Sequence, residues 1–510
     1  MFTFIGQTLT EVISHQIAEH SNTGKPLREF LSTVISEFEN SEFRKNMDVA
    51  WRYYNNENDI NKAKRMVIGR DPTTGQPVLV ESKVLANNKL NHNFLRKLTR
   101  QKIGYMLGKP FTLARTKSAP DDERADRFFE KTRKYMGMNF FSMIKNVARD
   151  SIVKGMGWIM VYYNEEGELK FKRVNPEEVI PLWADSDHIV LDAAIRKYTI
   201  EQYQGGKKKL LKFVDYYTLD GVYHFQYNDN GELVETEEPH TSNFYVTQLN
   251  KATGEIERVG VNWAKIPLIP FKYDPDEQNL LSRIKTLIDD YDSKTSGVAN
   301  SIDDFPNSIT VVKNYDGASK EEFVHNKNQY RTIFVQGDGD AKSLETKLNI
   351  EEIDKHLERL RQDIYEFGQG VNTANKDIRD TSGVALRFLY ADLDMDCMDW
   401  GSELQRSLMN LFWFIQQDIM AKEGEDFTDV GYEIVFNRDV IINESETIQN
   451  CFTSKGIISD ETIAANHPWT LNPRKEVEEL YKTTEETLAL EAEYGKKVSN
   501  PAEGQRSAKQ

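Results

Sequence analysis

One segment of the chain, residues 349–368, carries apolar side chains at strict intervals of three and four residues. Asn349 and Glu352 form a capping box that is typical of a helix start, and Gly368 is typical of a helix end. A stripe that repeats every 3.5 residues is narrow, and it packs against other helices rather than into a broad core. The segment therefore predicts a helix that belongs to a bundle or a ring. Its seam consists of Ile350, Ile353, Leu357, Leu360, Ile364 and Phe367.

A second amphipathic helix is expected between Pro275 and Pro306, because apolar residues recur there at helical spacing. The segment 304–348 joins the two helices and contains strand-like runs at 309–313 and 330–336. If the helices lie antiparallel, this segment forms a small module at the tip of a two-helix stalk. Helices of this size are about 30–40 Å long.

The rest of the chain predicts several domains of mixed helix and strand, so the fold class is α+β and mainly helical. A chain of 510 residues exceeds the ~250–300 residues at which single cores stop growing. Gly401 lies inside the longest predicted helix and predicts a bend there. The expected elements are helices at 40–55, 87–107 and 121–153, an antiparallel meander of strands from 157 to about 271, a long helix from 382 to 424 and a strand at 430–437.

Composition limits the classes of protein that this chain can be. A hydrophobic fraction of 39% allows real cores, and no apolar run reaches the ~18 residues that a membrane helix needs. Cys397 and Cys451 are too few for a disulfide framework or a metal site, so we expect reduced packing residues. The first residues lack a basic, cleavable signal segment, which predicts a cytosol-like compartment. A net charge of −16 argues against tight binding of nucleic acid, because DNA affinity comes mainly from Lys and Arg.

Positive charge is concentrated in residues 83–117, which hold nine basic residues and no acidic residue. Two interpretations stay open: a phosphate-facing surface, or a patch that pairs with an acidic neighbour. We favour pairing with a neighbour. Residues 455–469 (KGIISDETIAANHPW) faintly resemble a helix-turn-helix, but they carry one basic residue and are interpreted as two packed short helices.

The motif search finds no catalytic site. Residues 104–110 (GYMLGKP) resemble a phosphate loop, but three residues rather than four separate the glycines, and Pro110 stands where Ser or Thr would bind Mg²⁺. Asp392, Asp394 and Asp396 are spaced two apart, so on a helix they cannot share one ion. We interpret them as a solvated or subunit-facing stripe. The sequence therefore indicates a structural protein that is not an enzyme and has no metal or cofactor.

Five stretches of the chain carry a resemblance to a known family. They are NNKLNHNFLRKLTRQKIGYMLGKPFTL (87–113), VNPEEVIPLW (174–183), IKTLIDDYDSKTSGVANSIDDF (284–305), DTSGVALRFLYADLD (380–394) and KGIISDETI (455–463). In this order they resemble the portal proteins of tailed bacteriophages, of the type found in siphophages of Gram-positive hosts. The resemblance runs from about residue 45 to about residue 485.

The resemblance implies a portal fold that assembles as a ring around a central tunnel. Such proteins have a wing, a stem of two helices, a clip at the tip of the stem, a crown and a loop that lines the tunnel. On this chain the implied parts are a wing at 1–275, a first stem helix at 276–303, a clip at 304–348, a second stem helix at 349–370, a tunnel loop at 371–382, a long wing helix and strand at 383–439, a crown at 440–493 and a disordered tail at 494–510.

The resemblance also implies a function and a set of partners. The ring would stand at one capsid vertex of the virion, after assembly in the host cytoplasm, and double-stranded DNA would pass through it during packaging and ejection. The implied partners are other copies of the chain, in a ring of twelve, the terminase, a head-completion or adaptor protein, the scaffold and the major capsid protein, with no membrane. The alternative is a ring-forming capsid scaffold or connector through which no DNA passes.

Within the implied tunnel loop we expect Asn372, Asn375, Lys376 and Arg379 to touch the passing duplex weakly and without reading its sequence. The alternative is that these residues contact only neighbouring loops. The two stem segments are acidic: 276–304 has seven acidic and three basic residues, and 349–368 has six and three. Repeated around a ring, this charge would repel phosphates and let DNA slide.

Overall fold

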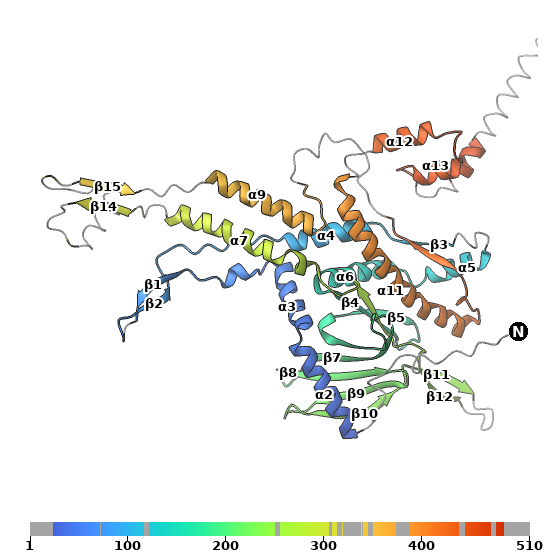
Figure 1. Cartoon of the computed structure of the whole chain (residues 1–510). Helices are drawn as coiled ribbons and strands as arrows, with labels where there is room; N and C mark the ends of the chain where they lie inside the picture. Colours follow the sequence, from blue (N-terminus) through green and yellow to red (C-terminus); the bar gives the residue numbers. More distant parts are fainter. Residues whose placement is uncertain are drawn as a thin grey trace, which may run out of the picture. The chain divides into compact units, whose positions relative to one another are not determined.

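The computed structural model describes most of the chain. The described residues are 24–71, 73–116, 122–249, 256–304, 309–313, 319, 338, 340–344, 350–373, 388–437, 444–470 and 476–483. They divide into two compact units. The first unit comprises Met1–Asn372 and Asp392–Asp439, and the second comprises Thr373–Ala391 and Val440–Gln510. Helix and strand are mixed throughout the first unit, which confirms the α+β class (Figure 1).

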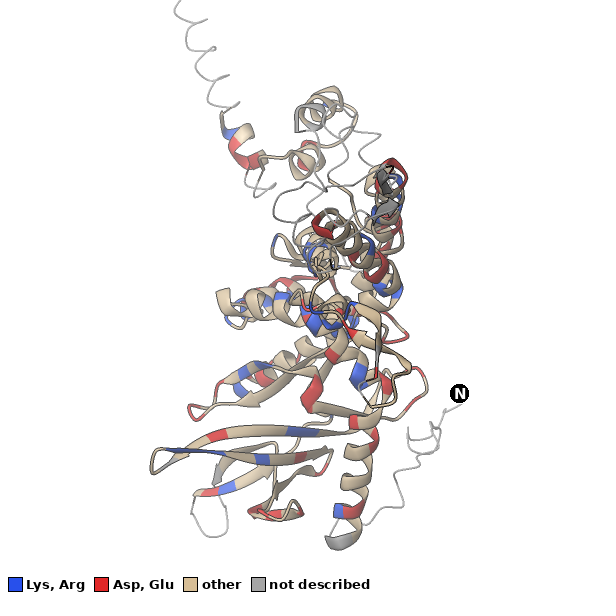
Figure 2. Cartoon of the chain, turned by 90° about the vertical axis from the view of Figure 1, so that its left-hand side faces the viewer, with Lys and Arg blue, Asp and Glu red and all other residues tan. Residues whose placement is uncertain are grey.

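Of the meander predicted from 157 to about 271, residues 179–241 form an antiparallel sheet of five strands in the order β10-β9-β8-β7-β6. The prediction was wrong at its two ends, because 156–174 and 268–272 form a separate sheet, and 244–249 pair with 256–261 alone. One face of the five-stranded sheet is covered by helix α2 (Gly24–Asn40), as Figure 2 shows. Leu27, Leu31 and Ile35 of α2 are buried against Ile195 and Val214 of the sheet, because an amphipathic helix places residues spaced by four on one face. The strands are β6 (Val179–Trp183), β7 (Leu191–Gln204), β8 (Lys207–Thr218), β9 (Gly221–Tyr227) and β10 (Leu233–Thr241).

A second antiparallel sheet, in the order β13-β4-β5, links the meander to the helices. Its strands are β4 (Met156–Tyr163), β5 (Leu169–Val174) and β13 (Leu268–Lys272). Helix α6 (Met138–Lys154) packs directly on this sheet. A Cβ atom on Gly157 of β4 would lie 2.5 Å from the carbonyl oxygen of Val147, so glycine permits this close approach.

The long predicted helix is α11 (Ala391–Glu423), and residues 383–387 of that prediction lie outside the described residues. Its buried residues recur at helical spacing and include Leu404, Leu408, Phe412 and Ile415. The helix is continuous through Gly401, where a Cβ atom would lie 2.6 Å from the Met106 methyl carbon. The predicted strand at 430–437 is confirmed as β16 (Tyr432–Val435), which pairs with β3 (Thr112–Arg115).

Two of the predicted N-terminal helices have different bounds. Residues 87–93 are not helical, and α4 covers Phe94–Leu107, because the side chain of Asn93 caps the backbone N–H of Arg96. The helix predicted at 121–153 is two helices, α5 (Glu123–Thr132) and α6, since the chain turns extended at Gly137. The prediction at 40–55 is confirmed as α3 (Glu42–Tyr54), which Ser41 caps.

Three hairpins extend from the first unit. They are β1–β2 (Met66–Arg70 and Pro77–Glu81), β11–β12 (Phe244–Leu249 and Ile256–Val261) and β14–β15 (Ile309–Lys313 and Asp340–Leu344). The predicted strand at 309–313 is confirmed as β14. The predicted strand at 330–336 lies outside the described residues, and the partner of β14 is β15.

In the second unit, α12 (Glu444–Thr453) and α13 (Asp460–Asn466) pack together, as expected of two short helices around 455–469. Ser459 caps α13, and the free thiol of Cys451 is buried. In the first unit, Cys397 is also buried and forms no disulfide, which agrees with packing roles for both cysteines. Within the described part of the chain, no helix has the length and apolar character needed to cross a membrane. Residues 494–510 lie outside that part.

Candidate site: the two-helix stalk and its base

The two predicted amphipathic helices form a stalk, α7 (Leu280–Asp304) and α9 (Ile350–Phe367), which lie side by side (Figure 1). His356 of α9 lies 3.1 Å from the carboxylate of Asp290, and Gly368, twelve residues later, lies near Ile284. The helices therefore run antiparallel, and α9 ends at the base of the stalk. The first helix begins at Leu280 rather than 276, because Asn279 caps it by accepting a hydrogen bond from the Ser282 N–H at 3.0 Å.

The seam of α9 is tightest near the base of the stalk. Leu360 and Ile364 are buried, with 7% and 0% of their surfaces exposed, whereas Ile353 and Leu357 are half-buried. Phe367, the last seam residue, is 56% exposed. The side chain of Ile350 lies outside the described residues. The seam as a contact between helices of a ring stays a prediction.

A row of polar side chains on α7 holds the extended residues 86–92, which we call the strap. Each row member accepts a hydrogen bond from a strap N–H, and the bonds fall on every second strap residue. The pairs are Ala86 N to Asp304 Oδ1 (3.0 Å), Asn88 N to Asn300 Oδ1 (2.5 Å), Leu90 N to Ser296 Oγ (2.9 Å) and His92 N to Asp292 Oδ1 (3.0 Å). The strap therefore runs antiparallel to α7.

We call these four hydrogen bonds the acceptor ladder. They can form because the repeat distance of the helix matches that of the extended chain. Four residues of an α-helix rise about 6.0 Å, and two residues of an extended chain advance about 6.6 Å. A helix with an acceptor at every fourth position can therefore satisfy alternate N–H groups of an extended segment. Asp292, Ser296 and Asn300 are nearly inaccessible to solvent, with exposed fractions of 0%, 2% and 6%. The sequence signal is the four-residue spacing of small polar residues along an amphipathic helix, and apolar periodicity alone does not reveal it.

The strap and α9 lie on opposite faces of α7. Asp292 binds the strap, whereas Asp290 pairs with His356 of α9. Residues two positions apart on a helix point about 200° away from each other. Helix α7 is therefore held on two sides. Phe94, directly after the strap, closes the base by edge-to-face contacts with Tyr291 of α7 and Tyr365 of α9.

A buried charge cluster at the base of the stalk is centred on Asp396 of α11. Its carboxylate accepts hydrogen bonds from Lys102 at 2.6 Å, Arg283 at 2.9 Å and the Tyr273 hydroxyl at 2.7 Å. These partners come from α4, α7 and the segment after β13, so one carboxylate joins four parts of the chain. Burial lowers the pKa of the Lys102 ammonium and raises that of the Tyr273 hydroxyl, which keeps the tyrosine protonated as a donor.

The cluster corrects the interpretation of the three aspartates as a solvated stripe. Asp396 is 5% exposed, and Asp394 accepts a hydrogen bond from the Tyr105 hydroxyl at 2.8 Å. Asp392 alone of the three is exposed. The interpretation was wrong for Asp396 because the buried cations that face it lie 294 and 113 residues away in sequence. Among the described residues, no group of three or more His, Cys, Asp or Glu side chains has the arrangement of a metal site.

The chain that leaves α9 is fixed to the same cluster. Gln369 receives a hydrogen bond on its backbone oxygen from Lys102 at 3.0 Å and one on its side chain from Arg283 at 2.7 Å. The side-chain amide of Gln101 donates a hydrogen bond to the backbone oxygen of Val371 and accepts one from the backbone N–H of Val371. A Cβ atom on Gly370 would lie 2.1 Å from a Leu98 methyl carbon, so α4 packs closely against the chain where it leaves α9.

The predicted tunnel loop starts at this fixed exit. Asn372 is half-buried at the end of the anchored segment. Asn375, Lys376 and Arg379 lie outside the described residues. The structure therefore describes the root of the loop, and the contact of these four residues with DNA stays a prediction.

The basic stretch 83–117 is confirmed as pairing with acidic neighbours at two positions. Lys102 binds Asp396, and Arg115 forms an ion pair with Asp126. Two further basic groups lie over aromatic rings: Arg96 over Tyr54 and Lys97 over Tyr365, at 5.5 and 5.2 Å. Lys83, Lys89, Arg96 and Arg100 are exposed.

The acidic residues of α7 also have internal partners. Asp292 and Asp304 bind the strap, and Asp289 binds Tyr53 and Lys285. Much of the negative charge counted on the first stem segment is therefore used within the subunit. The exposed acidic residues of the stalk are concentrated on α9, at Glu351, Glu352, Asp354, Glu358 and Glu366.

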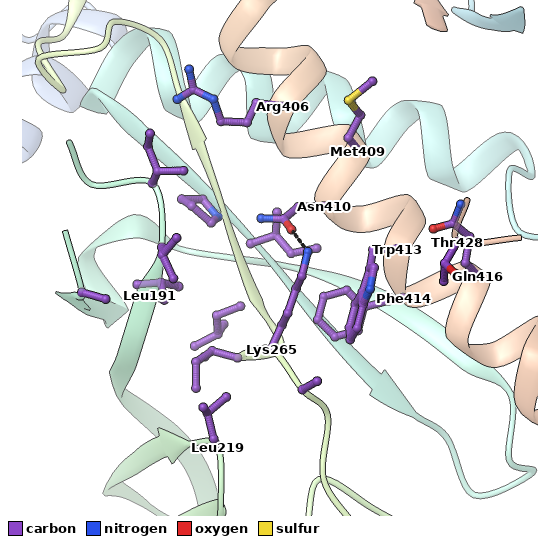
Figure 3. A pocket seen from close by; sticks show the side chains of 18 of the residues that line it. Leu191, Leu219, Lys265, Arg406, Met409, Asn410, Trp413, Phe414, Gln416 and Thr428 are labelled. Atoms are coloured by element: carbon purple, nitrogen blue, oxygen red, sulfur yellow. Dashed lines mark hydrogen bonds between the residues drawn. The ribbon is translucent and has the colours of Figure 1, made fainter. Parts of the chain in front are cut away.

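A hollow of about 730 Å³ lies in the body of the first unit, between α11 and β13 (Figure 3). Lys265 donates a hydrogen bond to Asn410 at 2.7 Å and lies 4.8 Å from the centre of the Trp413 ring. Burial lowers the pKa of this lysine. The lining contains no His, Cys or Ser among the described residues, so it holds no nucleophile and base of the serine or cysteine type.

Comparison with known proteins finds relatives over most of the chain. The model of the family "Phage portal protein, SPP1 Gp6-like" matches residues 37–488. The portal protein of Bacillus phage SPP1 is 28% identical over 483 residues, which cover 93% of this chain and 90% of that protein. The portal protein of Clostridium phage phiCD119 is 27% identical over 447 residues, or 84% of this chain and 90% of that protein.

The acceptor ladder predicts a site-specific effect of Ser296→Ala. The substitution removes the acceptor of the Leu90 N–H, and the loss of one hydrogen bond costs about 0.5–1.5 kcal/mol. We expect faster hydrogen–deuterium exchange in a peptide that spans 86–92. Ser293→Ala, on the exposed side of the same helix, is the matched control and should leave that exchange unchanged. Equal exchange in the two variants would contradict the ladder.

The charge cluster predicts that Asp396→Asn strongly destabilises the fold. It leaves Lys102 and Arg283 without their shared anion, and breaking a buried ion pair costs about 3–5 kcal/mol. The midpoint of denaturant unfolding should therefore fall well below that of Asp399→Asn, an exposed aspartate on the same helix. Adding Lys102→Met to Asp396→Asn should recover part of the loss. A midpoint equal to that of Asp399→Asn would show that the cluster does not stabilise the fold.

Proposed function

Since the chain belongs to the SPP1 Gp6-like family of phage portal proteins, we propose that it assembles into a ring-shaped channel at one vertex of the capsid. Double-stranded DNA enters the head through this channel during packaging and leaves through it during ejection. The observation that carries the proposal is the family match, which extends over the stalk, its base and the root of the loop. Portal proteins are structural rather than enzymatic, so the work of translocation belongs to a separate motor.

The parts of the chain take the following roles in this proposal. The wing is 1–275 together with the long helix and strand of 383–439, and the stem consists of α7 and α9 within 276–303 and 349–370. The clip is 304–348, the tunnel loop 371–382 and the crown 440–493. The pairing of β14 with β15 beyond the stalk supports a compact clip. The anchoring of Gln369 and Val371 supports a loop that is held firmly at its root.

The stem presents acidic charge, and the loop presents balanced charge, toward the passing DNA. On α9, two of the basic residues are paired within the helix, Lys355 with Glu351 and Arg359 with Asp363, which limits their capacity to hold phosphates. Weak contact suits a channel, because each Lys–phosphate contact that displaces counterions adds affinity and slows sliding. Asn372, Asn375, Lys376 and Arg379 then touch the duplex backbone without reading its sequence.

The assembly has twelve copies of the chain. Other proteins bind to its surfaces one after another. The terminase binds during packaging, and a head-completion or adaptor protein follows it. The scaffold and the major capsid protein surround the ring at the vertex. Assembly takes place in the host cytoplasm, and the mature location is the virion.

Imaging of the purified full-length chain tests the ring. Negative-stain top views should show a turbine-shaped particle with a central hole, because stems that stand around an axis leave it open. Solution mass should correspond to a multiple of the subunit. A stable monomer would contradict the proposal, and a ring without a through-hole would favour the scaffold or connector alternative.

The loop contact predicts that Lys376→Ala with Arg379→Ala alters packaging while leaving rings intact. Removing two cations weakens contact with phosphates. The packaging rate and the length of packaged DNA should change when the variant complements a phage that lacks its portal. The matched control, Asp377→Ala with Asp380→Ala, removes two anions from the same loop and should not weaken phosphate contact. An unchanged packaging rate and DNA length in the first variant would refute the contact.

A further inference from the structure

Two faces of the stalk carry opposite charge. The strap and the first two turns of α4 expose Lys89, Arg96 and Arg100. The outer side of α9, which points away from α7, exposes Glu351, Lys355, Glu358, Gln362 and Glu366. Lys355 is paired with Glu351 in the helix at 2.7 Å, so the outer side is negative overall. Figure 2 marks the charged residues in a view onto the tip of the stalk.

The two charged faces lie on opposite sides of one subunit. The strap is bound to the side of α7 that carries Asp292, and α9 is bound to the side that carries Asp290. The layers are therefore strap, α7 and α9, with the basic surface at one end and the acidic surface at the other. A subunit with different, complementary faces at its two sides joins its copies head to tail, and such a contact closes into a ring when the rotation permits.

The charges also match in height along the stalk. Both the strap and α9 run from the tip toward the base. Lys89 lies between the α7 levels of Ser296 and Asn300. Glu351 lies in the first turn of α9, about 7.5 Å nearer the tip than His356, which pairs with Asp290 of α7. Arg96 follows Phe94, which contacts Tyr291 of α7 and Tyr365 of α9. His356, which pairs with Asp290 beside Tyr291, precedes Glu358 by two residues, so Glu358 lies in the stretch of α9 between these contacts. From Glu351 to Glu358 the helix rises about 10.5 Å.

Equal height is the condition for a closed ring whose axis runs along the stalk, because rotation about that axis moves no residue up or down. We propose that the strap side of one copy binds the outer side of α9 in the next copy, with Lys89 facing Glu351 and Arg96 facing Glu358. The inference rests on the proposed function, since it names the subunit contact of the proposed ring.

The hairpin β1–β2 continues the strap side and adds apolar surface. Its base is tied to the end of α7, because Arg65 pairs with Asp304 at 3.2 Å. Ile68 and Leu79 face each other across the two strands and are 79% and 69% exposed. A hairpin of two strands is marginally stable alone in water. In the proposed contact the next copy covers this face.

Charge reversal tests the contact. One variant carries Lys89→Glu and Arg96→Glu, and a second carries Glu351→Lys and Glu358→Lys. Each variant alone places like charges opposite each other, so the fraction of chain in rings should fall at least tenfold by mass photometry at physiological salt. In a one-to-one mixture every contact between unlike copies regains opposite charges. Alternating rings should therefore form. A chain with all four reversals should form rings as well.

Lys207→Glu with Lys212→Glu makes the same change of charge on β8 and should leave ring formation intact. The proposal is overturned if each stalk variant alone forms rings like the unaltered chain. It is equally overturned if neither the mixture nor the fourfold variant regains rings, even where the single-face variants fold poorly. If the unaltered chain forms no ring, the proposed function fails instead, so the two failures are distinct.

Discussion

Helix α7 is the element on which the stalk depends, because it is bound on two opposite faces. On one face, four polar side chains accept hydrogen bonds from N–H groups of the extended strap, which a neighbouring strand would accept in a sheet. On the other face, the apolar seam of α9 packs, most tightly at Leu360 and Ile364. Asp292, Ser296 and Asn300 are buried, and a buried polar side chain is costly unless it is bonded, so the hydrogen bonds of this ladder fix the register of the strap. The result is a three-layered stalk with two different sides.

The stalk is joined to the body through one buried carboxylate. Asp396 gathers Lys102, Arg283 and Tyr273, and Lys102 and Arg283 in turn hold Gln369 where the chain leaves α9. A buried charge is stable only when its partners surround it, so these elements must come together for the cluster to form. The chain that leaves α9, helix α7 and helix α11 are therefore fixed with respect to one another within the first unit.

Periodicity was sufficient to predict the elements whose burial follows a simple pattern. The meander, the two stalk helices and the strand at 432–435 have a repeat of two or about 3.6 residues that the sequence displays directly. Residues 87–92 of the strap were predicted as helix, because this polar stretch, with three asparagines, carries no apolar repeat that separates helix from extended chain. Its extended form is set by acceptors about 200 residues later. The role of Asp396 depends on contacts of the same long range, which a local pattern does not contain.

A side-chain-resolution reconstruction of the assembled ring would show whether the stalks line a channel. We expect α7 and α9 of every copy to stand along the symmetry axis and to enclose an opening wide enough for a DNA duplex, with the exit of α9 turned toward that opening. Stalks that point away from the axis, or a centre filled by packed side chains, would contradict this expectation.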